Sequence, residues 1–323
     1  MSQTKRNHYL PQTYLKHFLH EDHLFVYMKG EKFFNADFNI ERRILGVKGE
    51  EGLKNIGLEN RLYDPGVEGI KPNDIEEIFQ AYGEDTYDSL INTLEDIPLG
   101  GAISRELKWQ VATFMAAMRV RTPLFKAEIE QMDEAVQKHL LAMEFGRMTP
   151  EEVQSFYRDQ IGKDMTLELA TSVQRGFAEK TYKFDYPNGH FIKYALLMLE
   201  HHAHIFNAFN IRVLRTEKIF FYTSDNPVVY FVPRERINAY VSPRTLMSPY
   251  TELFFPLSKN LCVVGNRRGS PDEMVKATIE YADICNLNIA CQSNEYIFAP
   301  FKTNRLDKYI ENYIPFPFVF RVS

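Results

Sequence analysis

The sequence predicts an α+β fold, in which a helical layer packs on a mainly antiparallel sheet and the N-terminal segment docks onto this body. Between residues 74 and 209, apolar residues recur about every 3.6 positions, the period of a helix that faces a core. From residue 210 onward the period falls to about 2, which is typical of strands. No linker marks this change in composition, so we expect residues 1–323 to form a single cooperative unit.

The first part of that unit, residues 1–73, predicts mostly short elements. "NHYLPQTYLKHF" (7–18) indicates an extended piece followed by a short amphipathic helix, with Tyr14 and Phe18 on one face. "HLFVYMKGEKFF" (23–34) alternates in polarity around Gly30 and predicts a hairpin. Residues 41–73 are rich in Gly, Asn and Pro, which favours irregular structure.

The second part, residues 74–209, predicts a series of helices separated by caps and breakers. Asn73 or Asp74 can cap a helix whose apolar stripe runs to Leu94. Ser104 starts another helix, which Pro123 breaks, and a further stripe covers residues 125–143. "MTPEEVQSF" has a Thr cap followed by Pro at the first helical position, and residues 190–209 form a strongly apolar helix.

The third part, residues 210–323, predicts a sheet with one long helix. "IRVLR" and "KIFFYTS" indicate a hairpin joined by Thr216-Glu217. "PVVYFV", "ELFFPL", "LCVVG", "EYIFAP" and "PFVFRV" each predict a strand. Residues 270–292 predict a helix, because Ser270, Pro271 and Glu273 resemble a capping box.

Composition restricts the class of protein. The 45% hydrophobic share and the many aromatic residues require a sizeable core, which excludes intrinsic disorder. Three cysteines without a C-x-x-C indicate neither a zinc cage nor a disulfide framework, and the N-terminus lacks a secretory apolar region. No apolar run approaches the ~20 residues that span a bilayer. We therefore expect a cytoplasmic location and no membrane partner.

Charge is unevenly distributed along the chain. Residues 212–268 contain nine Lys or Arg and four Asp or Glu, a balance of +5, whereas the whole chain carries -5. This basic C-terminal part permits binding to a nucleic acid or another phosphate-bearing ligand.

The helix of residues 190–209 contains a histidine cluster with two interpretations. Glu200 and His204, or His201 and His204, have the spacing of a metal-binding pair, but no remote ligand completes a set. His202 lies on the apolar stripe, so we expect a core residue with one satisfied hydrogen bond.

Two arginines in "MRVRTP" lie on or beside an apolar helix face. Arg121 shares the face of the stripe and Arg119 lies at its edge, and a buried guanidinium needs an anionic partner. One interpretation is a structural ion pair of Arg121, with Glu84 or Asp225. The other is a pocket for a phosphate or carboxylate. Glu84 otherwise has the pattern of a surface charge.

"FYTSDNPVV" follows a predicted strand and suits a turn around Ser224 and Asp225. Pro227 favours an extended backbone at Asn226. A turn at a strand end is also where polar groups reach a functional site, so Asp225 is a candidate general base, metal ligand or orienting group. P-loop, Rossmann and nucleophile-elbow motifs are absent from the sequence, which disfavours those chemistries.

Taken together, "NHYLPQTYLKHF", "RTP", "FYTSDNPV", "FPLSKNL" and "LNIACQSNEYIFAP" resemble, in this order, the bacterial family called domain of unknown function 4238. The resemblance covers essentially the whole chain. Leu10 replaces the usual Val, and Thr13 replaces the usual aromatic residue. Some members occur on mobile elements and in antiviral defence islands, so the resemblance implies an anti-phage defence effector.

These observations support two hypotheses. In the first, the chain is a nuclease or other phosphodiester-directed hydrolase in which His8 is the general acid or base and Asp225 orients it or binds a divalent metal. In this hypothesis the substrate is bound by Gln12, Arg119, Arg121 and Asn226. His8 precedes a helix N-terminus, whose positive end favours the neutral imidazole. In the second hypothesis, the same residues form a non-catalytic sensor or binding module for a phage protein or a nucleotide.

Overall fold

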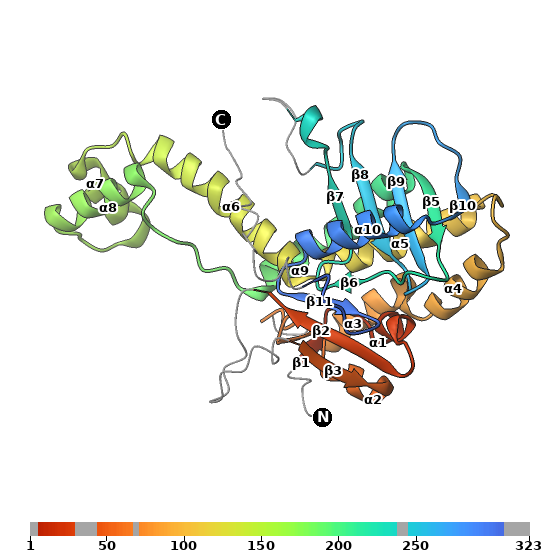
Figure 1. The fold of residues 1–323 in the computed structure, drawn as a ribbon. Helices are drawn as coiled ribbons and strands as arrows, with labels where there is room; N and C mark the ends of the chain where they lie inside the picture. The colour runs from red at the N-terminus through yellow and green to blue at the C-terminus, as the bar shows by residue number, and fades with distance from the viewer. Residues whose placement is uncertain (1–5, 30–43, 67–70, 238–244, 307–323) are drawn as a thin grey trace.

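The computed structural model describes residues 6–29, 44–66, 71–237 and 245–306. The chain forms an α+β body from which one long helix projects as an arm (Figure 1). This architecture confirms the predicted fold class, including the mainly antiparallel pairing of the strands.

The larger sheet has the strand order β10-β5-β9-β8-β7. Its members are β5 (Asn210–Arg215), β7 (Val229–Phe231), β8 (Glu252–Pro256), β9 (Leu261–Asn266) and β10 (Glu273–Lys276). β10 runs parallel to β5, and the other pairs are antiparallel, with Val213 opposite Val263 in the central pair. The strands of this sheet are rich in Val, Leu and Phe, because both faces of the sheet are buried.

Helices cover both faces of the larger sheet. Leu261 and Val263 of β9 face the core shared with α5 (Arg105–Val120) and α9 (Asn188–Asn207). Cys262 and Val264, which alternate with them, face α10 (Ile279–Gln292). The sheet is therefore the middle layer of three (Figure 1).

A second sheet, with the order β3-β2-β11-β6, brings distant parts of the chain together. It contains β2 (His23–Met28), β3 (Ile44–Lys48), β6 (Thr223–Ser224) and β11 (Tyr296–Ala299). Beside it, β1 (Arg6–His8) pairs with β4 (Leu58–Asn60). α1 (Gln12–Leu15), the 3-10 turn η1 (Lys16–Phe18) and α2 (Gly49–Leu53) complete this N-terminal region.

The helix predicted from Asp74 to Leu94 is broken in the structure. α3 (Pro72–Phe79) passes into a π-helical turn, η3 (Gln80–Glu84), and α4 (Tyr87–Asp96) follows. Gly83 has φ = 130°, a conformation that a residue with a side chain rarely adopts, so glycine allows the break.

Polar caps define the helices of the arm, and the cap of α7 is the one that the sequence predicted. Thr122, Thr149 and Thr166 each accept a backbone N–H at the starts of α6 (Pro123–Glu144), α7 (Pro150–Ile161) and α8 (Leu167–Glu179). Pro occupies the first position of α6 and of α7. In the described ranges, no helix combines the length and the apolar character needed to cross a membrane.

Three further predicted elements differ from the structure. Residues 218–222 form no hairpin with β5, because β9 already pairs along β5 and the chain moves on to the second sheet. Residues 273–276 are strand β10, and the helix begins at Ile279 with Thr278 as its cap. The stretch 41–73, expected to be irregular, contains β3, α2 and β4. The Gly30 turn and the strand "PFVFRV" lie outside the described residues.

Candidate functional site

The N-terminal segment is part of the main core, and Tyr14 is its anchor. The Tyr14 ring stacks on Phe255 at 6.0 Å and contacts Phe18 at 5.1 Å. Its hydroxyl donates to the carbonyl oxygen of Pro256 at 2.8 Å, so the Thr223 hydroxyl, at 2.6 Å, donates to Tyr14. The first motif is thus tied directly to "TSDNP" and to "FPLS", which confirms the predicted docking of this segment.

His8 lies at the end of β1 and its side chain is half-buried. Its Nε2 atom lies 3.3 Å from Gln12 Nε2. A hydrogen bond with the Lys54 backbone favours the charged form, which identifies the carbonyl as the acceptor. With one ring nitrogen donating to Lys54, the other accepts from Gln12, and this pattern is that of the neutral imidazole.

Charged groups surround His8. Burial lowers its pKa from 6.5, and the Arg121 charge lowers it further, while Glu76 and Glu84 oppose the shift. The sequence also predicted a neutral His8, but from the positive end of the following helix. In the structure, burial and the Arg121 charge are what lower the pKa. Glu76 accepts a hydrogen bond from Asn7 Nδ2 at 2.7 Å and is held next to β1.

Arg121 is buried and clamps three parts of the chain together. It forms an ion pair with Glu84, donates to the His8 carbonyl oxygen at 2.7 Å, and donates to the Tyr63 hydroxyl at 3.3 Å. The guanidinium also lies over the Phe79 ring, 5.1 Å from its centroid. The structural ion pair with Glu84 is therefore present, and Glu84 is not the free surface charge that its position suggested. The break at Gly83 turns it inward.

Arg119 occupies a separate buried cluster. It forms an ion pair with Glu128 at the base of α6 and a 3.3 Å hydrogen bond to the Tyr230 hydroxyl. Its guanidinium lies 5.0 Å from the Phe125 ring centroid. Nearby His202 is buried as predicted, but its Nδ1 has no hydrogen-bond partner among the described residues. Burial, with Arg119, lowers the pKa of His202 to about 3.

Asp225 holds the loop that leads from α10 into β11. Its carboxylate accepts three backbone N–H bonds, from Asn294 at 2.8 Å, Glu295 at 2.6 Å and Tyr296 at 3.0 Å. Burial raises its pKa to about 6, although these three bonds favour the charged form. Asn226 donates to the Gln292 carbonyl oxygen at 2.9 Å, so both residues join the same loop.

The buried Lys29 contacts the start of the same loop. Lys29 donates to the Ser293 carbonyl oxygen at 3.0 Å and to the Cys291 carbonyl oxygen at 3.4 Å, near the C-terminal end of α10. Burial lowers its pKa to about 8, and the charge of Asp225 opposes this shift. A cation at this helix end is favoured, because the last carbonyl groups carry partial negative charge.

Asp225 acts on Tyr9, the residue next to His8, but not on His8 itself. Asp225 raises the pKa of the buried Tyr9 hydroxyl, second to burial itself, whereas the charges that act on His8 come from Glu76, Arg121 and Glu84. The structure therefore brings His8, Gln12 and Arg121 together, whereas Asp225 and Asn226 belong to a second network and Arg119 to a third.

The basic C-terminal part uses much of its charge internally. Arg215 donates to the carbonyl oxygens of Leu94, Glu95 and Ile97, and Arg267 donates to the carbonyl oxygen of Leu246. Arg212 and Arg268 form ion pairs with glutamates. Because these arginines have partners within the chain, less of the basic charge is available to a phosphate-bearing partner.

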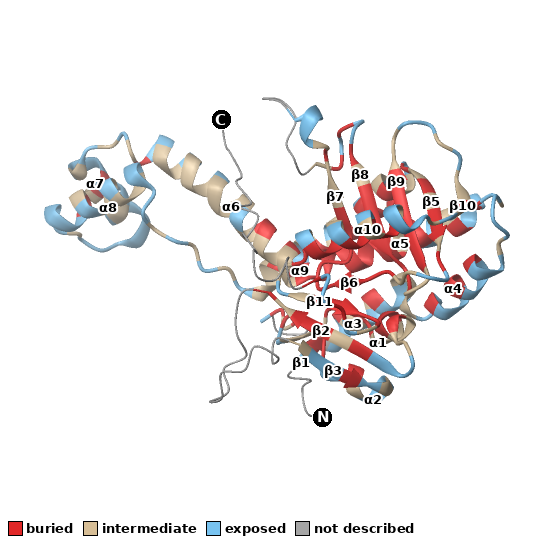
Figure 2. Ribbon diagram, in the orientation of Figure 1, coloured by how far each residue is buried: buried red, intermediate tan, exposed pale blue. Residues whose placement is uncertain are grey.

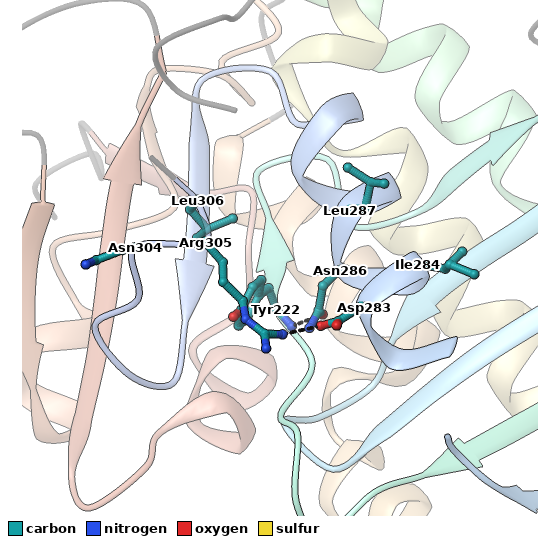
Figure 3. Close-up of a pocket in the computed structure, with 8 residues that line it drawn as sticks. All are labelled: Tyr222, Asp283, Ile284, Asn286, Leu287, Asn304, Arg305 and Leu306. Atoms are coloured by element: carbon teal, nitrogen blue, oxygen red, sulfur yellow. Dashed lines mark hydrogen bonds and ion pairs between the residues drawn. The ribbon is translucent and has the colours of Figure 1, made fainter. Parts of the chain in front are cut away.

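A shallow pocket of about 530 Å³ lies between α10 and residues 304–306 (Figure 3). Asn286 at its floor is already bonded to Tyr222 N and to the Phe220 carbonyl oxygen. Arg305 and Asp283 form an ion pair across its rim at 2.5 Å. Ile284, Leu287 and Leu306 supply apolar walls, and the Arg305 charge is already paired, so this pocket suits an apolar group better than a phosphodiester.

Metal ligands do not gather in the described part of the chain, which holds no group of three His, Cys, Asp or Glu suited to an ion. Glu200 and His204 lie 3.8 Å apart on the exposed side of α9, as an isolated pair. Tyr63 and Glu76, which complete the surroundings of His8, were not identified from the sequence, since neither belongs to a motif.

The fold and this site define an α+β protein whose N-terminal motif is built into the core and presents a neutral histidine beside a buried Arg–Glu pair. The chain belongs to the family described as "Protein of unknown function (DUF4238)", whose model matches residues 6–302. No curated protein and no solved structure matches the chain.

Proposed function

We propose that the protein is an anti-phage defence effector that hydrolyses phosphodiester bonds, with His8 as its general acid–base. The observation that carries the proposal is the half-buried, neutral imidazole of His8, whose accepting nitrogen faces Gln12. A neutral imidazole can take a proton from an attacking water or hydroxyl once Gln12 releases its accepting nitrogen, and such catalysis contributes about 10²–10⁴-fold. The defence role rests on the family resemblance.

Neighbouring residues have supporting roles in this proposal. Gln12 positions the substrate next to the ring, and Arg121 with Glu84 fixes the backbone of His8. Asp225 acts as a positioning residue, because its three backbone bonds hold the loop beside Tyr9. Asn226 and Arg119 stabilise the surrounding loop and the base of α6.

A divalent metal is part of the proposal as an assisting group. Mg²⁺ is commonly held by one or two carboxylates together with substrate phosphates. The charges of Glu76 and Glu84 both act on His8, but Glu84 is paired with Arg121 and Glu76 accepts from Asn7, so the metal would depend on the substrate phosphate for most of its ligands. Assays with and without a chelator test this role directly.

Infection experiments test the defence function. Cells that produce the wild-type chain, His8→Ala or His204→Ala are challenged with a panel of phages, and plaques and the integrity of nucleic acids are recorded. His204 is 64% exposed and distant in sequence from the motifs, so it serves as the control. We expect wild-type and His204→Ala cells to resist at least one phage while nucleic acid is degraded, and His8→Ala cells to be sensitive. Equal protection by His8→Ala contradicts the proposal.

A second candidate function is a non-catalytic sensor. The observation that favours it is that the buried Arg121 and Asp225 direct their polar atoms to partners within the chain, so they brace the fold and are not available for chemistry. A sensor predicts protection without any nucleic-acid cleavage by the purified protein, and the stable capture of a phage protein or nucleotide.

A further inference from the structure

The antiparallel ribbon formed by β1 and β4 has an outer and an inner face. Along β1, Arg6 is exposed, Asn7 is buried and His8 is half-buried, which is the alternation of a strand. The surface around β1, β3 and α2 has exposed and half-buried stretches (Figure 2). Residues directly opposite each other in an antiparallel pair lie on one face. Asn60 pairs with Arg6 and Leu58 pairs with His8, so these four residues share the outer face of the ribbon.

The inner face of the ribbon holds its acidic residue. Asn7 donates to Glu76 at 2.7 Å and accepts from the Tyr63 N–H at 3.3 Å, so its side chain is directed into the protein. Glu59 lies opposite Asn7 and therefore belongs to this inner face. The outer face thus combines the Arg6 cation with an imidazole, and its four residues include no carboxylate.

Arg6 is available for a ligand, whereas Arg121 is not. Arg121 is buried and donates to the His8 carbonyl oxygen and to the Tyr63 hydroxyl. Its charge is balanced by the ion pair with Glu84. Within the part of the chain that the structure describes, no hydrogen bond or ion pair engages the exposed Arg6 guanidinium. A cation for the substrate is therefore present beside His8, on the outer face of the ribbon.

We propose that Arg6 binds the phosphate group of the substrate next to His8. This inference rests on the proposed function and names the residue that holds the anion there. A two-residue step along a strand is about 6.6 Å, so one phosphodiester can contact both side chains. A guanidinium donates two parallel N–H bonds to two oxygens of one phosphate. In a diester these are the two non-bridging oxygens, which leaves the ester oxygens free to face His8.

The basic C-terminal part offers a matched control. Arg234, in the 3-10 turn η4 (Arg234–Arg236), is exposed like Arg6. It follows β7, which lies at the opposite side of the body from β1 (Figure 1). Replacing Arg234 therefore changes the net charge by the same amount without touching the proposed contact.

Initial rates on a chromogenic diester test the proposal. Arg6→Ala should fold normally, because the side chain is exposed, and should lower kcat/KM by about 10-fold or more through the loss of charge-assisted bonds. Arg6→Lys should recover part of this loss, since lysine keeps the charge without the paired donors. Added guanidinium ion should raise the rate of Arg6→Ala and leave Arg234→Ala at the wild-type rate. A wild-type kcat/KM in Arg6→Ala overturns the proposal.

Binding to single-stranded DNA separates this proposal from the proposed hydrolysis. His8→Ala serves as the background, and fluorescence anisotropy gives the dissociation constant of a labelled oligonucleotide. Adding Arg6→Ala should raise this constant by about 10-fold or more. It should also lower the slope of log affinity against log salt by about 0.7, whereas Arg234→Ala should change neither.

The outcomes of the binding experiment are distinct. No binding at all, an unchanged dissociation constant in Arg6→Ala, or a loss caused by Arg234→Ala in its place overturns the role of Arg6, whether or not the wild-type protein is a hydrolase. Binding that depends on Arg6 in a protein without hydrolytic activity supports this role and contradicts only the proposed hydrolysis.

Discussion

His8 combines access to solvent with a fixed ring orientation, the two properties that proton transfer requires. The bond to the Lys54 backbone and the bond from Gln12 set the ring orientation, and half-burial lowers its pKa from 6.5. At neutral pH the ring is therefore unprotonated and ready to act as a base. The Arg121 clamp fixes the backbone at this residue, so the ring position depends on a contact made more than 100 residues later in the chain.

The pH dependence of hydrolysis should follow the His8 ring. Because the neutral form is active, kcat/KM should be level above pH 7 and should fall only below the ordinary histidine value of 6.5. Gln12→Glu places a carboxylate at the ring, favours the imidazolium, and should move this limb to higher pH. A pH–rate profile of both proteins checks this prediction, and an identical limb in the two proteins would argue against His8.

The buried, neutral His202 should make the protein less stable in acid. Its pKa is about 3 in the folded protein and 6.5 in the unfolded chain, so between these values the unfolded chain binds more protons. The free energy of unfolding should therefore fall as pH decreases from 6.5, by about 1.4 kcal/mol per unit at most. His202→Phe should remove this part of the slope, whereas His204→Phe, on the exposed side of the same helix, should retain it. Urea denaturation at pH 7.5 and pH 5 measures the difference.

At the scale of elements, the break between α3 and α4 positions the carboxylate that pairs with Arg121. The apolar stripe alone predicted one continuous helix, because Ile75, Phe79, Leu90 and Leu94 do share a helical period. The conformation of Gly83 interrupts it, and Glu84 follows directly. A glycine in a helical pattern is visible in the sequence, but neither its positive φ nor the Phe114 ring that packs against it can be predicted from local residues.

Gly83→Ala should destabilise the protein. A Cβ at this position would lie 3.0 Å from Phe114 Cδ2, and φ = 130° is strained for alanine. We expect a loss of about 1–3 kcal/mol. Gly176→Ala is the matched control, since α8 is regular there and the nearest atom, Thr181 Oγ1, is 3.8 Å away. That substitution should stabilise by about 0.4–1 kcal/mol. Denaturation curves with changes of the same sign would refute this account.

Local signals explain which elements were predictable. The Thr-Pro start of α7 depends on neighbouring residues alone, so the sequence located it. Glu273 in "SPDEMVK" had the pattern of a capping box, yet residues 273–276 pair with β5 as a parallel strand. Tertiary pairing overrode the local preference there. The same limit applies to the site: the motifs indicated His8 and Arg121, whereas Tyr63 and Glu76 reach them only through the fold.

At the scale of the whole molecule, Tyr14 joins the N-terminal, helical and β parts of the chain. It contacts Tyr87 of α4 and Phe255 of β8 and bonds to Thr223 of β6. We therefore expect the predicted single cooperative unit to unfold in one transition. The lone tryptophan, Trp109 on α5, reports on the helical layer, and circular dichroism reports on the whole.

Tyr14→Phe should shift the unfolding transition to lower stability by the same amount whether Trp109 or circular dichroism reports it. The substitution leaves Thr223 and the Pro256 carbonyl group without a buried partner, at a cost of about 1–3 kcal/mol. Tyr250→Phe, at a 37% exposed residue, should cost much less. Two separate transitions, or a shift confined to one signal, would contradict a single unit.

The most direct test of the central claim is the rate at which the purified protein hydrolyses a phosphodiester, measured for wild type, His8→Ala and His204→Ala on single-stranded DNA, RNA and a chromogenic diester. The account predicts that His8→Ala folds normally and loses at least 100-fold in rate, while His204→Ala keeps the wild-type rate. A wild-type rate in His8→Ala, or no hydrolysis of any of the three substrates by the wild-type protein, would contradict it.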